Sequence, residues 1–219
     1  MRIASLIDVD NTLLDNDAAK RDLAQGLVDS LGEAGADRFW TVYEEVRAEL
    51  GVVDIPRTIG RTLGREMPLP DRERLAALFM EFPFREYIYP DALETIAWLK
   101  ERGPVVILSD GDPVFQIAKI VRSGLADAAD GNVLVFTHKE EHLLEIGAAF
   151  PAERYLLIDD KPGVIERMTA RAHELPGPLE TILVRQGKYA AAIGDDPAPW
   201  PGATYTVDRL GEVRERVGG

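Results

Sequence analysis

The sequence predicts an α/β fold built on a parallel β-sheet, interrupted by a helical insertion. Short runs rich in Val, Ile and Leu alternate with segments of helical periodicity, as expected for strands that are buried on both faces and joined by helices. The chain has 219 residues, of which 46% are hydrophobic, which suits one domain or a domain with a modest insertion. One long interval, residues 15–87, breaks the alternation and lacks a convincing strand.

Five apolar runs are the predicted strands, and the first four end at a polar residue that phosphate-transfer chemistry can use. They are IASLI (3–7) before Asp8, VVIL (105–108) before Ser109, VLVF (133–136) before Thr137, YLLI (155–158) before Asp159 and TILV (181–184) before Arg185. In an open parallel sheet, ligands bind outside the carboxyl ends of the strands. One pocket is therefore expected to collect several carboxylates and a hydroxyl, with Lys139 nearby.

The segments between these runs have helical periodicity. Residues 91–102 place Leu93, Ile96 and Leu99 near one stripe, and Gly103 ends the segment. Further helices are expected at 112–121, 141–149 and 162–170, the last beginning with a proline in its first turn. After residue 185 the pattern weakens, and a short helix is expected at 208–217.

Residues 15–87 are interpreted as an inserted helical cap domain between two parts of a core domain, 1–14 and 88–219. The interval is too long for an ordinary connection between a strand and a helix. The helices expected in it are 17–31, 36–50 and 72–80, with Gly32 and Gly35 between the first two.

The composition excludes several classes of function. The net charge of −13 disfavours binding to nucleic acid or to an anionic membrane, because phosphate backbones require clustered Lys and Arg. The absence of cysteine excludes disulfides, thiolate metal sites and thiol nucleophiles. We find no apolar stretch that could span a bilayer and no signal peptide, and therefore expect a cytoplasmic protein. The sequence leaves the oligomeric state open.

Asp8 and Asp10 are the candidate catalytic residues. A carboxylate can attack phosphorus and form an aspartyl-phosphate, which divides one difficult step into two. Asp10 could protonate the departing alkoxide and then deprotonate the hydrolytic water, and such positioned acid–base help typically contributes about 10²–10⁴-fold. A calcium-binding loop is excluded, because its sixth position is Leu13 rather than Gly and its twelfth is Ala19 rather than Glu.

Asp159 and Asp160 form a second acidic pair, at the end of another predicted strand. With Asp8 and the backbone carbonyl of Asp10, they are expected to hold Mg²⁺, which prefers oxygen ligands. Which of the two binds the metal directly is left open. A purely structural alternative is that the pair caps the helix that begins at Pro162.

Ser109, Asp110, Gly111 and Lys139 are the candidate phosphate ligands. The Ser109 hydroxyl and the following two backbone N–H groups could cradle phosphate oxygens, and Lys139 would supply a fixed positive charge. The role of the adjacent His138 stays open. Taken alone, Ser109 would be interpreted as a helix cap and Lys139 as a solvated surface lysine. Their order along the chain, together with the two acidic pairs, favours the functional interpretation.

Four segments, DVDNTLLD, ILSDGD, THKEEH and LLIDDKP, resemble the four ordered motifs of the haloacid dehalogenase (HAD) superfamily. The resemblance covers essentially the whole chain. It implies a Rossmann-like, three-layer core and, in one large branch, a helical cap inserted after the first motif. It also implies that Asp8 is the nucleophile and Asp10 the acid–base. Two positions depart from the family pattern: Glu140 follows the lysine in place of proline, and Ile158 precedes the late acidic pair in place of glycine.

The predicted function is a Mg²⁺-dependent phosphomonoester hydrolase that acts on a small phosphorylated metabolite. Dehalogenation is disfavoured, because dehalogenases of this architecture lack an acid two residues after the nucleophile and need no magnesium. Phosphonate hydrolysis would require a cap lysine able to form a Schiff base, and the proposed cap contains only Lys20. A phosphosugar mutase and a catalytically silent binding module remain as alternatives.

The sequence does not identify the substrate. Some arginines of the proposed cap could face the cleft, although most are expected only to keep the helices soluble; they are Arg21, Arg38, Arg47, Arg57, Arg61, Arg65, Arg72 and Arg74. The roles of His173, Arg185 and Gln186 are likewise undecided.

Overall fold

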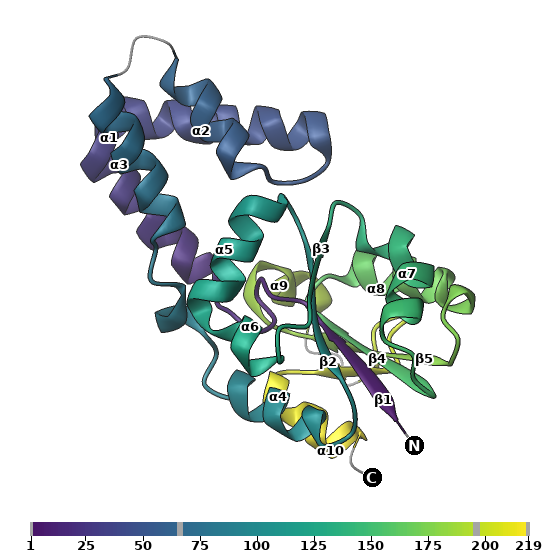
Figure 1. Cartoon of the computed structure of the whole chain (residues 1–219). Helices are drawn as coiled ribbons and strands as arrows, with labels where there is room; N and C mark the ends of the chain where they lie inside the picture. The colour runs from purple at the N-terminus through teal and green to yellow at the C-terminus, as the bar shows by residue number, and fades with distance from the viewer. Residues whose placement is uncertain (1, 65–67, 195–197, 218–219) are drawn as a thin grey trace.

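A computed structural model describes residues 2–64, 68–194 and 198–217 of the chain (Figure 1). Its centre is a six-stranded parallel sheet with the strand order β3-β2-β1-β4-β5-β6. The strands are β1 (Ile3–Ile7), β2 (Val105–Asp110), β3 (Val133–Phe136), β4 (Arg154–Asp159), β5 (Leu179–Val184) and β6 (Tyr205–Val207). The α/β fold and the five predicted strands are confirmed, whereas β6 was not predicted.

Helices cover both faces of the sheet, so the core has three layers. The helices of the core are α4 (Ala92–Lys100), α5 (Pro113–Ser123), α6 (Leu125–Ala128), α7 (Leu143–Ala149), α8 (Pro162–Ala170), α9 (Ala190–Ile193) and α10 (Val213–Val217). Apolar side chains of α4, α5, α6 and α10 share one cluster with β1, β2, β4, β5 and β6. A second cluster on the opposite face contains side chains of α7, α8 and α9. This arrangement is the expected Rossmann-like core.

Single 3₁₀ turns complete the connections of the core. They are η1 (Phe84–Tyr87), η2 (Lys139–His142), η3 (Ala172–Glu174), η4 (Gly187–Tyr189) and η5 (Leu210–Glu212). The predicted helix at 141–149 is thus a turn followed by α7, and the predicted helix at 208–217 is η5 followed by α10.

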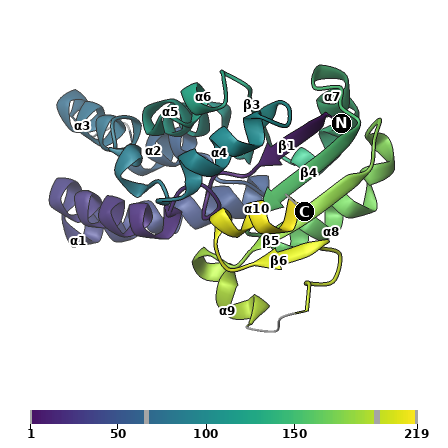
Figure 2. The ribbon, with the colours of Figure 1, turned by 90° about the horizontal axis from the view of Figure 1, so that it is seen from below.

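Three helices occupy the interval between β1 and α4: α1 (Asn16–Leu50), α2 (Ile55–Leu63) and α3 (Leu69–Met80). Figure 2 shows them to one side of the strands. No strand is found among the described residues of this interval, as predicted. The two helices expected at 17–31 and 36–50 are joined as α1, whose backbone breaks only at Gly32 (φ 70°, ψ 170°). We refer to residues 16–80 as the helical segment.

Helix α2 was not predicted, although local signals for it exist. The Asp54 carboxylate accepts a hydrogen bond of 2.8 Å from the backbone N–H of Arg57, which caps the helix, and a proline lies in its first turn. The sequence singled out only the arginines of this stretch, and one of them, Arg65, lies outside the described residues.

Two short linkers connect the helical segment to the core, and they lie side by side. The N–H of Asp15 donates to the carbonyl of Tyr87 (2.8 Å), and the N–H of Tyr89 donates to the carbonyl of Leu13 (3.0 Å). Aromatic rings add contact: Phe79 of α3 lies 6.1 Å, centroid to centroid, from Phe115 of α5. No helix among the described residues is long and apolar enough to cross a membrane.

Candidate active site

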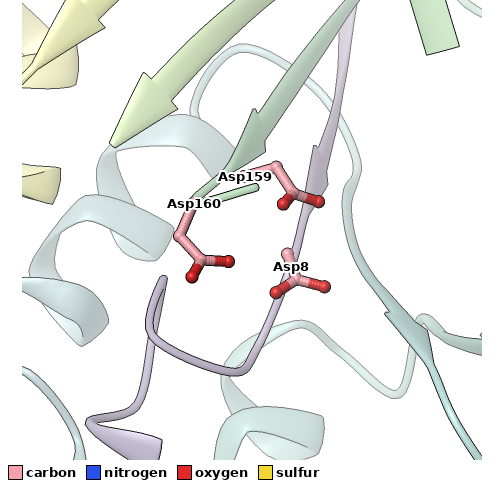
Figure 3. A group of neighbouring side chains, drawn as sticks. All are labelled: Asp8, Asp159 and Asp160. Carbon is pink, nitrogen blue, oxygen red and sulfur yellow. The ribbon is translucent and has the colours of Figure 1, made fainter. Parts of the chain in front are cut away.

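Three aspartates meet where β1 and β4 end (Figure 3). Asp8 follows β1, while Asp159 ends β4 and Asp160 follows it. All three are buried, and one carboxylate oxygen from each lies within 4.8 Å of the other two. The two strands are paired in register from Ile3 with Arg154 to Ile7 with Ile158. That pairing places the first and the last acidic motif next to each other, as predicted from the strand ends.

Two lysines stand against this carboxylate cluster. The Lys139 ammonium, at the start of η2, lies 2.6 Å from Asp8 Oδ1 and 2.7 Å from Asp159 Oδ2. Its side chain is fully buried, so the simple reading of a solvated surface lysine is wrong. Lys161 was not predicted; its Nζ lies 3.8 Å from Asp8 Oδ2. The signal for it was its position, directly after the late acidic pair at a strand end.

The carboxylates of the cluster are only partly satisfied. Asp8 Oδ2 and both carboxylate oxygens of Asp160 are buried without a hydrogen-bond partner. Burial raises the pKa of Asp8 to about 6, although Lys139 and Lys161 oppose the rise. Burial, followed by the charge of Asp159, raises the pKa of Asp160 to about 9. A divalent cation bound to these oxygens would favour their ionised forms. The cluster therefore fits a hard cation such as Mg²⁺.

Lys139 stays charged in this environment. Burial alone would lower its pKa, but the charges of Asp159 and Asp8 outweigh burial and raise the pKa above its ordinary value. Lys139 is thus a fixed cation between two carboxylates.

The carboxylate of Asp10 lies outside this cluster and has its own partners, which were not predicted. Asp10 Oδ1 accepts a bond of 2.7 Å from Lys119 Nζ, and Oδ2 accepts one of 3.2 Å from Gln116 Nε2. Lys119 also donates to Asn16 Oδ1 (3.2 Å). Burial alone would raise the pKa of Asp10, but the charges of Lys119 and Lys161 outweigh it and lower the pKa. The expected metal ligand at Asp10 is its backbone carbonyl, which stays a prediction.

The sequence of α5 contains an indication of these partners of Asp10. Its buried face includes Gln116 and Lys119, whereas Val114, Ile117 and Val121 are exposed. Gln116 and Lys119 share this buried face with the apolar Phe115 and Ile120, so two polar residues stand where a core-facing stripe is usually apolar. A buried lysine requires an anionic partner, and here that partner is Asp10.

The three consecutive phosphate-ligand candidates differ in their surroundings. The buried Ser109 hydroxyl faces the Gln116 amide, which donates to it at 3.1 Å. The Asp110 carboxylate accepts a bond of 2.8 Å from the backbone N–H of Lys139 and so fixes the start of η2. The N–H of Gly111 donates to the carbonyl of Phe136 (2.9 Å). This bond contradicts the expectation that the Gly111 N–H faces a phosphate, because parallel pairing with β3 continues one residue beyond β2.

A cleft of about 640 Å³ separates the strand ends from the helical segment. Asp10, Asp110 and Lys161 line its core side, and Lys20, Tyr43 and Arg47 line its helical side. Arg47 is the one arginine of the predicted cap set that lines it, among those the structure describes. His138 also lines the cleft. His173 lies in η3, and Arg185 pairs with Asp208 (2.7 Å).

The fold and this acidic edge define a class: a Rossmann-like α/β hydrolase whose aspartates gather at the ends of parallel strands. The chain belongs to the haloacid dehalogenase-like hydrolase family, whose model matches residues 4–160. The resemblance drawn from the four motifs is thereby confirmed at the level of the family. A search of curated proteins returned no match.

Solved structures support the same placement. A haloacid dehalogenase-like hydrolase from Burkholderia xenovorans LB400 is 36% identical, with a TM-score of 0.84 and coverage of 99% of this chain and 97% of that one. The magnesium-bound HAD-hydrolase YfnB from Bacillus subtilis is 16% identical, with a TM-score of 0.67 over 100% and 99% of the two chains. A 2-haloacid dehalogenase from Pseudomonas syringae pv. tomato DC3000 gives the same values. The last two likenesses establish the fold alone.

Proposed function

We propose that this hydrolase is a Mg²⁺-dependent phosphomonoesterase that acts on a small phosphorylated metabolite through an aspartyl-phosphate at Asp8. The observation that supports it most is the buried group of Asp8, Asp159 and Asp160, whose oxygens lie within 4.8 Å of one another. Three such carboxylates repel one another and a phosphate, so the arrangement suits a site that also binds a divalent cation.

Asp8, Asp159 and Asp160 would hold the metal, together with the backbone carbonyl of Asp10. When bound, Mg²⁺ offsets the repulsion between an anionic nucleophile and an anionic substrate. Asp8 is the nucleophile in this proposal, because its Oδ2 accepts no hydrogen bond, while Lys139 restrains Oδ1. Lys139 and the hydroxyl of Ser109 would bind phosphoryl oxygens.

Asp10 supplies the proton transfers in this proposal. Lys119 and Gln116 hold its carboxylate, and the lowered pKa keeps it ionised in this arrangement. The ionised form is the base that takes a proton from the water that attacks the aspartyl-phosphate. For the earlier step, Asp10 must carry a proton to the leaving alkoxide. If bound substrate displaced Lys119 from Asp10, the pKa of Asp10 would rise and its protonated form would be favoured.

Two other reactions fit the same nucleophile. A dehalogenase would use Asp8 to attack carbon, and solved dehalogenases share this fold. The Asp10 carboxylate and the Asp159–Asp160 pair favour a phosphate ester over a haloacid. A phosphosugar mutase would use the same residues but would return the phosphoryl group to a sugar. Neither a nucleic-acid partner nor a membrane is part of the proposal, and a cytoplasmic location remains a prediction.

A substrate comparison tests the proposal. Release of inorganic phosphate from p-nitrophenyl phosphate and from a panel of phosphorylated metabolites is measured with Mg²⁺ and again with EDTA. Halide release from L-2-chloropropionate is measured in parallel. We expect phosphate release that depends on Mg²⁺ and is lost in Asp8→Asn. Halide release without phosphate release would instead establish a dehalogenase, and phosphate exchange between sugar hydroxyls without net release would establish a mutase.

A further inference from the structure

The helical side of the cleft carries a lysine that the proposed chemistry does not use. Lys20 lies in the first turns of α1 and lines the cleft together with Asp10. Its ammonium donates a hydrogen bond of 2.9 Å to the hydroxyl of Tyr43. It also lies 4.6 Å from the centroid of the Tyr43 ring and 5.6 Å from that of Trp40. These neighbours are neutral. They hold the Lys20 ammonium in place but do not neutralise its charge.

The other cations of the cleft are better compensated. Lys119 pairs with Asp10, Arg167 with Glu140, and Lys161 with Asp8. Arg47 pairs with Glu44 at the surface, and Lys188 is exposed to solvent. Within the part of the chain that the structure describes, Lys20 is the partly buried ammonium of this cleft that forms no ion pair with a carboxylate.

This position is unfavourable for a charge without a counter-ion. Leu23, Trp40 and Phe79 line the same side of the cleft and reduce access to water. Burial lowers the pKa of Lys20, and the charges of Asp10 and Glu44 offset the effect only in part. An anionic group of a ligand would supply the missing partner. It would also gain more from the contact here than at a surface, because the surroundings are less polar.

Tyr43 has the matching hydrogen-bond capacity. Its side chain is buried, and its oxygen accepts from Lys20. Its hydroxyl hydrogen has no acceptor among the described contacts, so it can be donated into the cleft. An ammonium and a hydroxyl that point to one place can bind the two oxygens of a carboxylate, each through a strong hydrogen bond to a charged group.

We propose that Lys20 and Tyr43 form a subsite for a carboxylate on the organic part of the substrate, opposite the phosphoryl site at Asp8. The substrate would then be the phosphate ester of a small hydroxy acid. The inference rests on the proposed function for the identity of the phosphoryl end. The subsite selects the leaving group and takes no part in bond making.

Binding to a variant that lacks the nucleophile tests this subsite. Calorimetry with Mg²⁺ on Asp8→Asn compares two matched pairs of probes: 3-phosphoglycerate with glycerol 3-phosphate, and phosphoglycolate with 2-hydroxyethyl phosphate. In each pair the carboxylate is replaced by a hydroxymethyl group. We expect the carboxylate member of at least one pair to bind about 10- to 100-fold more tightly, the range of a hydrogen bond to a charged group.

Lys20→Met in the same background should remove this preference, bringing the ratio of affinities close to one. Lys20→Arg should retain a preference, and Tyr43→Phe should reduce it by about 3- to 10-fold, as for loss of one hydrogen bond. Lys100→Met, whose lysine pairs with Asp130 outside the cleft, is the matched control and should leave the ratio unchanged. A melting temperature close to that of the parent shows that each variant is folded.

Several results would overturn the subsite: equal affinities within both pairs, no measurable binding of either carboxylate, or a ratio that survives Lys20→Met. Failure of the proposed function looks different. Wild-type protein would then release no phosphate from any ester, while the affinity ratio and its loss in Lys20→Met would still be observed.

Discussion

The two sides of the cleft are built on different principles. At the strand ends, next to the residues that line the core side, Asp8 and Asp159 are fixed by the register of paired strands, and Lys139 contacts both. On the helical side, Lys20 is held by two aromatic residues and has no counter-ion among the described residues. Under the two proposals above, the strand ends carry the reaction and the helical segment selects the ligand.

The largest effect is expected from the core side. Asp8→Asn should lower turnover by at least about 10⁴-fold, because a neutral amide cannot form the acyl-phosphate. The substitution is nearly isosteric, so the melting temperature should stay within a few degrees. Steady-state phosphate release with p-nitrophenyl phosphate measures the first quantity, and thermal unfolding measures the second. Wild-type rates in this variant would disprove the assignment of the nucleophile.

Removal of the metal should come next. Addition of EDTA should reduce phosphate release by about 10²- to 10³-fold, since loss of a bound cation removes several kcal/mol of charge stabilisation. Mg²⁺ should also raise the melting temperature of wild-type protein, because a ligand that binds only the folded state stabilises it. Asp160→Asn should weaken this stabilisation, whereas Asp130→Asn, which alters a surface ion pair, should not. A chelator-resistant rate would contradict the metal assignment.

A smaller effect is expected from the residues that hold Asp10. Lys119→Met should lower kcat by about 10- to 100-fold, because a catalytic group that loses its partners is misplaced. Lys119 lowers the pKa of Asp10, so the pair stabilises the fold at neutral pH and this contribution is lost as the pH falls through the folded-state pKa. The variant should therefore lose about 1–3 kcal/mol at pH 7 and less near pH 3.

Urea unfolding at the two pH values measures this difference, with Lys100→Met as the control for loss of an exposed lysine. A penalty that is equal at both pH values would show that packing, and not the charge of Lys119, carries the effect.

The smallest effect concerns movement between the two sides. We propose that residues 15–87 form a cap that closes on the core about hinges near residues 14–16 and 87–91, because closure would exclude water from the reaction. Small-angle scattering of Mg²⁺-loaded protein, with and without beryllium fluoride as a phosphate mimic, should give a slightly smaller radius of gyration with the mimic. Superimposable profiles would count against a large closure.

The sequence predicted the core side of the cleft better than the helical side. Strand ends can be recognised in the sequence because a buried parallel strand is a continuous apolar run. The polar residue that follows it must then lie at the ligand-binding edge of the sheet. Strand β6 was not predicted because it has only three residues and follows a proline-rich stretch of sequence. The hydrogen bond from the Gly111 N–H to the Phe136 carbonyl could not be predicted, because the sequence does not specify where β3 ends.

Contacts made by helices were harder to foresee. Lys119 reaches Asp10 from more than a hundred positions along the chain, and the contact depends on how α5 is rotated against the sheet. The subsite at Lys20 depends on Tyr43, which the break at Gly32 brings back toward the start of α1. Neither relation has a fixed spacing in sequence.

The paired linkers of the helical segment have an evolutionary consequence. Because Leu14 and Ile88 form an isolated antiparallel bridge, the chain leaves the core for the helical segment and returns to the core at one place. A different set of helices could be grafted at this point, provided that it covers Phe115, and the strands and their acidic edge would keep their register. Under the two proposals above, such an exchange would change the surface that selects the leaving group and would leave the reacting residues unchanged.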